Sequence, residues 1–268
     1  MPPRLARPLR LAALLASLAA PAGAEALWRE DFSGDWMRRW NVVSIGKLGA
    51  RVETRETAAG LGTALRVVFP PDEARRGYSF RADLTPFIGH RERLWLSYRV
   101  RFSAGFDWQR GGKLPGLMTA WHGPVSGCRQ PDGTGGFSAR FVWRREGGVA
   151  LYPYVPPQPG FEPNPRGCAR ARPLGARIEP GRWVRLTQMV ALNAPGEADG
   201  RMRAWIDGEP ALALDGVRFR DRPFGIQGVL FATFYGGRCC APDEPGHHVD
   251  FADFAVHDAR PPGLRPFP

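Results

Sequence analysis

Residues 137–155 read FSARFVWRREGGVALYPYV, two segments of alternating side-chain character joined by a Gly-Gly turn. Side chains point alternately to the two faces of a β-strand, so Phe141 and Trp143 share one face while Ser138 and Arg140 share the other. The aromatic face must be buried in a core. The alternation therefore predicts a strand that carries Ser138 and Arg140 together on the outer surface.

The second segment repeats this arrangement. Tyr152 and Tyr154 point one way, and Leu151 and Val155 point the other way, into the core. Upstream, Lys113 lies in the sequence GGKLPGL, and we expect it to reach the same surface. A lysine, an arginine, a serine and two phenols on one surface form a candidate site for an anionic substrate.

Short alternating segments bounded by Gly and Pro recur through the rest of the chain. The segments that we expect to form strands are 51–54, 64–69, 78–84, 93–102, 183–192, 201–206, 228–235 and 249–256. We expect residues 156–173, rich in Pro and Gly, to be a long surface loop, and we expect no helix in the mature chain. This pattern predicts an all-β fold, a jelly-roll or concanavalin-like sandwich of two antiparallel sheets, in one domain spanning residues 25–268.

The first 24 residues have the features of a secretory signal. Three arginines precede the apolar run 11–20, and Ala22-Gly23-Ala24 has the small-residue pattern of a cleavage site. The apolar run is too short to cross a bilayer, so we expect no membrane anchor. The sequence therefore predicts a secreted or periplasmic protein whose mature chain begins near Glu25.

The expected mature chain is strongly basic. Without the three leader arginines, 34 basic residues stand against 26 acidic ones, a net charge of +8. A basic surface attracts acidic partners over long range, although an arginine-rich composition can also reflect codon usage alone. Because the arginines are scattered and the chain is exported, we expect an anionic polysaccharide as partner rather than nucleic acid. We also expect a monomer that needs neither a metal nor another cofactor.

Four cysteines, Cys128, Cys168, Cys239 and Cys240, are compatible with disulfides in an exported chain. They allow three pairings, one of which joins Cys128 to Cys168 and leaves an adjacent pair. The other two pairings join the 239–240 loop to both remaining cysteines. The absence of a C-x-x-C spacing disfavours a zinc site.

The residue types of the candidate site match the requirements of β-elimination from a uronate polymer. This reaction needs a cation or donor at the C6 carboxylate, a base for the C5 proton and an acid for the departing oxygen. Arg140 and Ser138 would hold the carboxylate, and the base would be Lys113, Tyr152 or Tyr154, which the residues alone leave unranked. Only two of the 37 basic residues are lysines, and an ammonium, unlike a guanidinium, can lose its proton and act as a base.

Three other functions compete with this one. Glycoside hydrolysis needs two suitably spaced carboxylates, and no E-x-D-x-E pattern occurs in the chain. A sandwich that binds acidic polysaccharide without cleaving it would need the same basic and aromatic residues, and a structural envelope protein would need no ligand. We expect three further residues, His122, Gln188 and Tyr235, to line the substrate groove, although such side chains also have purely structural roles.

Three motifs in order resemble polysaccharide lyase family 14, which contains alginate and glucuronan lyases. They are GGKLPGL at 111–117, FSARFVWR at 137–144 and LYPYVP at 151–156. Further similar segments are WVRLTQMVALN at 183–193, WIDG at 205–208, FATFYGG at 231–237 and DFADF at 250–254. The similarity covers roughly residues 98–256.

The resemblance implies a β-jelly roll that cleaves by β-elimination without an obligatory metal. The catalytic set that it implies consists of Lys113, Ser138, Arg140, Tyr152 and Tyr154. The chain departs from the family pattern in residues 118–136, which include WHG and a cysteine, and after Tyr-Gly-Gly, where RCCAP follows. Both departures border the expected groove and bear on substrate choice, so we expect a lyase of a β-1,4-linked uronate polymer, either glucuronan or alginate.

Overall fold

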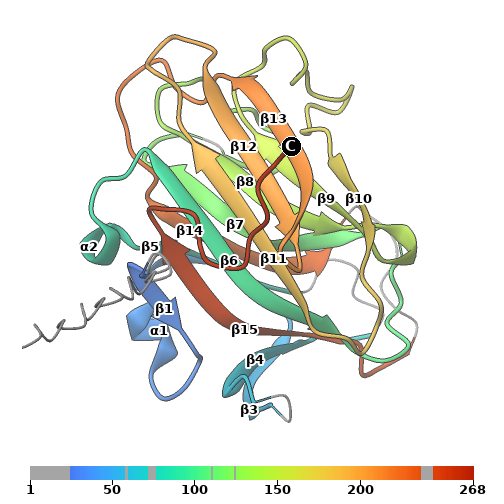
Figure 1. The fold of residues 1–268 in the computed structure, drawn as a ribbon. Coiled ribbons are helices and arrows are strands. Elements are labelled where there is room, and N and C mark those ends of the chain that lie inside the picture. The colour runs from blue at the N-terminus through green and yellow to red at the C-terminus, as the bar shows by residue number, and fades with distance from the viewer. Residues whose placement is uncertain (1–24, 58–59, 72–76, 110, 124, 237–243) are drawn as a thin grey trace, which may run out of the picture.

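The computed structural model describes residues 25–268 except 58–59, 72–76, 110, 124 and 237–243. Two antiparallel sheets pack face to face, which confirms the all-β jelly-roll sandwich predicted from the sequence (Figure 1). The expected leader, Cys239 and Cys240 lie outside the described residues. Within the described part of the chain, no helix is long and apolar enough to cross a membrane.

Sheet A contains eight strands. They are β1 (Trp28–Glu30), β3 (Arg51–Glu56), β4 (Thr63–Val68), β6 (Arg93–Phe102), β11 (Val184–Ala191), β12 (Gly200–Ile206), β13 (Glu209–Val217) and β15 (His248–His257). Their spatial order is β13-β12-β11-β6-β15-β4-β3, with β1 paired to β15. Strands distant in sequence are therefore neighbours in the sheet.

Sheet B contains seven strands and carries the candidate site. They are β2 (Val42–Leu48), β5 (Gly77–Asp83), β7 (Gly112–Ala120), β8 (Gly136–Trp143), β9 (Gly148–Tyr154), β10 (Arg172–Arg177) and β14 (Gly228–Tyr235). Their order is β10-β9-β8-β7-β14-β5-β2. The prediction of no helix was wrong for short pieces: α1 (Trp36–Arg39) and α2 (Thr85–Ile88) have four residues each, and a 3₁₀ turn spans Arg145–Gly147.

Aromatic side chains fill the space between the sheets, as the alternation predicts. Phe141 and Trp143 of β8 are fully buried. Phe80 and Phe231 stack with ring centroids 4.8 Å apart, and Trp40 meets Phe80 edge to face at 5.2 Å. Burying such rings supplies much of the stability of a sandwich. It also fixes the alternate residues of β8 and β9 on the outer face of sheet B.

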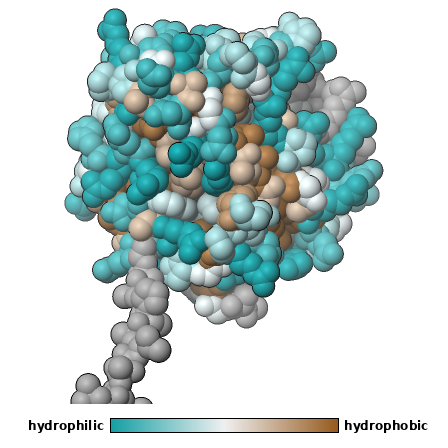
Figure 2. All heavy atoms as spheres, turned by 45° about the horizontal axis from the view of Figure 1, so that its top comes forward, coloured by the Kyte–Doolittle hydropathy of each residue, from teal (hydrophilic) through white to brown (hydrophobic). Residues whose placement is uncertain are grey.

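The outer face of sheet A is partly covered by the C-terminal segment, which passes over β11 and β12 (Figure 1). Leu264 packs against Trp205, whose ring lies 5.0 Å from that of Phe267 and whose indole N–H donates to the Arg265 carbonyl at 2.8 Å. Figure 2 shows hydrophilic residues around a band of hydrophobic ones on one face of the molecule. The candidate residues lie on the other sheet, sheet B.

Strand β7 was not predicted, because GGKLPGL contains residues typical of a turn. It is nevertheless a central strand that pairs with β8 and β14. Lys113 pairs with Val142 and Gly116 pairs with Arg140, so two residues of β7 stand opposite one residue of β8. This β-bulge places Lys113 and Gly116 on the same face although they are three positions apart.

Gly116 allows β7 and β8 to approach closely, since a Cβ atom there would lie 2.1 Å from the Ala139 carbonyl oxygen. We expect Gly116→Ala to lower the free energy of unfolding by about 1–3 kcal/mol, because the two backbones would have to separate. Gly148→Ala is a matched control, because its Cβ would meet its nearest atoms at an ordinary 3.5 Å. Urea denaturation measures both variants, and equal losses would contradict this account.

Candidate active site

Three adjacent strands bring the five candidate residues together on the outer face of sheet B. The register pairs Arg140 of β8 with Tyr152 of β9, and Ser138 with Tyr154. From β7, the Lys113 Nζ lies 4.3 Å from the centroid of the Tyr152 ring. The Arg140 guanidinium carbon lies 5.8 Å from the centroid of the Tyr154 ring. We refer to these five residues as the cluster.

Arg140 is a buried cation to which the described residues offer no carboxylate partner. Its residue is 3% exposed, and within the described residues no carboxylate pairs with the guanidinium and no acceptor meets its Nε. Burial lowers the pKa of Arg140 to about 10, which still leaves it charged at neutral pH. Because a buried charge without a counter-ion is costly, this position has the chemistry to receive an anionic group.

Lys113 holds its proton weakly. Burial lowers the pKa of Lys113 to about 7, and the positive charges of Arg140 and Arg144 act in the same direction. A substantial fraction of free amine is therefore present at neutral pH and can accept a proton. Burial raises the pKa of the adjacent Tyr152, so this phenol stays protonated and can act as a donor.

The segment between β7 and β8, which we call the β7–β8 loop, covers part of the cluster. Ser138 is fully buried, and its hydroxyl donates to the Val125 carbonyl of the loop at 2.6 Å. Tyr154 is 1% exposed, and its oxygen accepts the backbone N–H of Cys128 at 3.1 Å. In this structure the Ser138 hydroxyl therefore supports the loop, and its expected role at a substrate carboxylate stays a prediction.

Lys113 and Tyr152 are the cluster members that remain partly exposed. The oxygens of Tyr152 and Tyr154 lie 3.4 Å apart, so the exposed phenol is in contact with the buried one. A ligand that reaches this surface meets an amine and a phenol first, with the Arg140 guanidinium beneath them. This arrangement brings together groups that can act as a base, as an acid and as an anion-binding cation.

Two of the residues expected to line the groove are core residues instead. Gln188 of β11 is buried between the sheets, where its side-chain oxygen accepts the Leu117 N–H of β7 at 3.3 Å. Tyr235 of β14 is also buried, and its hydroxyl donates to the Asp107 carbonyl at 2.8 Å. His122 is exposed in the β7–β8 loop, and within the described residues no hydrogen bond joins its side chain to the cluster.

Sequence reasoning missed two cations on β5 and β2, at the other end of sheet B from β9. Arg81 of β5 points outward, and its charge acts on Arg140. Lys47 of β2 has its Nζ 4.8 Å from the ring centroid of Phe234, which pairs directly with Lys113. Alternation within residues 78–84 was sufficient to place Arg81 outward, whereas the position of Lys47 depends on the pairing of β2 with β5.

A disulfide joins Cys128 of the β7–β8 loop to Cys168 in the loop that precedes β10. Of the three pairings considered from the sequence, this bond is compatible with one. It links the two loops that follow β7 and β9.

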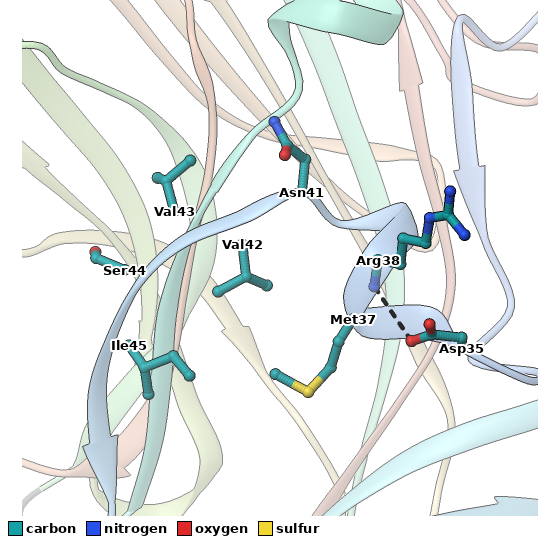
Figure 3. A pocket seen from close by; sticks show the side chains of 8 residues that line it. All are labelled: Asp35, Met37, Arg38, Asn41, Val42, Val43, Ser44 and Ile45. Carbon is teal, nitrogen blue, oxygen red and sulfur yellow. Dashed lines mark hydrogen bonds between the residues drawn. The ribbon is translucent and has the colours of Figure 1, made fainter.

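The hollow drawn in Figure 3 is separate from the cluster. Its lining residues are Asp35, Met37, Arg38, Asn41, Val42, Val43, Ser44 and Ile45. The Asp35 carboxylate caps α1 by accepting the Arg38 N–H at 3.4 Å, and Met37 and Ile45 are exposed. The hollow thus lies beside α1 and the edge strand β2, and contains none of the cluster residues.

Comparison with known proteins relates this chain to polysaccharide-degrading enzymes. A family model described as polysaccharide lyase 14 matches residues 61–254, and no curated protein sequence matches the chain. The PL-14 alginate lyase from Aplysia kurodai is 21% identical with a TM-score of 0.74, covering 88% of this chain and 100% of that one.

Two further solved structures share the fold. An alginate lyase from Chlorella virus is 20% identical with a TM-score of 0.62, over 82% of this chain and 93% of its own. An endo-β-1,4-glucuronan lyase from Trichoderma reesei is 17% identical with a TM-score of 0.60, over 88% of this chain and 96% of its own.

We expect Lys113→Met to raise the free energy of unfolding at pH 6 by roughly 1–3 kcal/mol. The pKa of Lys113 is about 7 in the folded chain against 10.5 ordinarily, so between these values the unfolded state binds more protons and the stability of the lysine protein rises with pH. The cost of the lysine is therefore largest below pH 7 and absent above pH 10.5. Urea denaturation at pH 6 and pH 10.5 measures the difference, and a methionine variant no more stable at pH 6 would rule out a desolvated ammonium.

Proposed function

Because the chain belongs to polysaccharide lyase family 14, we propose that it cleaves a β-1,4-linked uronate polymer, alginate or glucuronan, by β-elimination. The observation that carries this proposal is the buried Arg140 guanidinium, which no carboxylate of the described residues pairs, beside an amine and two phenols. The C6 carboxylate of a uronate supplies the missing anion. Its neutralisation by Arg140 makes the neighbouring C5 proton more acidic.

The two partly exposed members of the cluster supply the proton transfers. Lys113, as the free amine, removes the C5 proton, and the electron pair of the C5–H bond forms the C4–C5 double bond. The C4–O4 bond breaks with its electron pair leaving on O4, and the phenol of Tyr152 gives its proton to that departing oxygen. The lowered pKa of Lys113 and the raised pKa of Tyr152 support this division of roles at neutral pH.

We also propose that the enzyme acts outside the cytoplasm. The signal-like sequence of residues 1–24 and the Cys128–Cys168 disulfide support export into an oxidising compartment. A polymer substrate that is itself outside the cell is consistent with that location.

The direct test is incubation of the protein with a panel of acidic polysaccharides, including alginate and glucuronan. We expect the ultraviolet absorbance of an unsaturated product, and we expect kcat/KM to rise about tenfold per pH unit below pH 7 and to level off above it, because Lys113 must be neutral to act as base. Lys113→Met should lower kcat by about a thousandfold or more.

Other outcomes would replace the proposal. Reducing ends without that absorbance would identify a hydrolase. Tight binding of the same polymers without any product would identify a binding protein, which the basic outer face of sheet B could also serve.

A second prediction concerns Arg81 of β5, which lies further along the same face of sheet B. Three strand spacings of about 4.8 Å separate β5 from β8, so the backbones of Arg81 and Arg140 are about 14 Å apart, more than one sugar unit. We expect Arg81→Met to raise KM for the polymer about three- to tenfold with kcat within about twofold. The variant would lose the ion pair between Arg81 and the carboxylate of a neighbouring sugar unit.

Arg177→Met is the matched control for this variant. Arg177 lies at the end of β10 and is exposed, and it pairs with Glu146 at 2.7 Å. Steady-state kinetics with the same polymer should show no change in KM. An unchanged KM in Arg81→Met, or an equal rise in both variants, would remove Arg81 from the binding surface.

A further inference from the structure

Tyr154 is buried, yet both sides of its hydroxyl have a partner. Its oxygen accepts the Cys128 N–H at 3.1 Å and lies 3.4 Å from the Tyr152 oxygen. The backbone N–H can only donate, so the hydrogen of Tyr154 needs another acceptor, and within the described residues the Tyr152 oxygen is the one that meets it. The contact of the two oxygens by itself allows either to donate; with Tyr154 as the donor, Tyr152 accepts on its buried side and keeps its own hydrogen for its exposed side.

We propose that the Cys128 N–H, fixed by the Cys128–Cys168 disulfide, aims the proton of Tyr152 at the substrate by way of Tyr154. Cys128 and Tyr154 are then positioning residues, and Tyr152 is the acid that touches the sugar. The inference rests on the proposed function, and it assigns separate roles to the two tyrosines.

The donor is held in place from the side of the β7–β8 loop. Cys128 has a φ of 61°, a left-handed conformation that a residue with a side chain adopts only when its surroundings impose it. The Gln130 side chain donates to the Gly167 carbonyl at 2.7 Å, and the Ser138 hydroxyl holds the Val125 carbonyl of the same loop. The disulfide adds a covalent constraint at the donor itself.

The other half of the disulfide is also anchored. The Asn164 side-chain oxygen accepts the Cys168 N–H at 3.1 Å and the Arg166 N–H at 2.9 Å, which closes a tight turn around Cys168. Earlier in that loop, Gln158 exchanges two hydrogen bonds with the Arg218 backbone, at 2.7 and 2.8 Å. The position of the Cys128 N–H is therefore held by contacts in both loops.

The hydrogen bonds from the Cys128 N–H to Tyr154 and from Tyr154 to Tyr152, which we call the relay, also account for the charge that the reaction leaves behind. When Tyr152 gives its proton to O4, its oxygen becomes a phenolate that accepts the Tyr154 O–H, and the Tyr154 oxygen keeps the Cys128 N–H. Oriented donors of this kind stabilise developing negative charge. The proton that Lys113 took from C5 then returns to Tyr152 through solvent, which restores the starting state.

A double-mutant cycle tests the coupling. We expect Tyr154→Phe to lower kcat about 10- to 100-fold and the paired change Cys128→Ser with Cys168→Ser to lower it about tenfold, both with KM within about twofold. In the Tyr154→Phe background, the two serine changes should alter kcat by less than about twofold, because the relay is already broken. A full further loss in that background, or a loss confined to KM, would overturn the proposal.

Amide hydrogen exchange tests the contact without relying on activity. The Cys128 amide should exchange about tenfold faster or more in Tyr154→Phe than in the wild type, and Tyr152→Phe should leave it protected. Unchanged exchange in Tyr154→Phe would overturn the relay even if the enzyme is a lyase. Conversely, a wild-type protein that gives no unsaturated product would refute the proposed function, whatever the exchange shows.

Discussion

A guanidinium buried in sheet B, with no carboxylate partner in the part of the chain that the structure describes, is the constraint on which the rest of the site depends. Burying a charge is costly, and Arg140 also lowers the affinity of Lys113 for its proton. The fold bears this cost because the aromatic layer between the sheets sets the strands of sheet B independently of the cluster. The site thus combines a permanent cation with a neighbouring amine that is easily deprotonated, a combination suited to an anionic substrate.

The parts of the site that follow from side-chain alternation were predictable. In β8 and β9 the aromatic and aliphatic residues determine which face is buried, so Arg140, Tyr152 and Tyr154 had to share the opposite face. The same rule was available for two predictions that were wrong. Gln188 shares its face of β11 with the buried Leu186 and Val190, and Tyr235 shares its face of β14 with the buried Phe231. Both were assigned by residue type instead of by their position in the strand.

Other features depend on contacts that no local pattern encodes. The strand containing GGKLPGL was not predicted. Its glycines allow close packing against β8, a reason visible only when the neighbouring strand is known. The covering of Ser138 and Tyr154 depends on where the β7–β8 loop folds back, and that path is fixed by a disulfide to a residue 40 positions away. The residues that gather in the cluster were therefore predictable, and the contacts that bury some of them were not.

The bulge in β7 determines how many residues can separate Lys113 from Gly116. Without the bulge, residues three positions apart on a regular strand would face opposite sides of the sheet, and the side chain of Lys113 would point toward the aromatic interior. The place of the amine is inherited through the spacing of the backbone as much as through the identity of the residue.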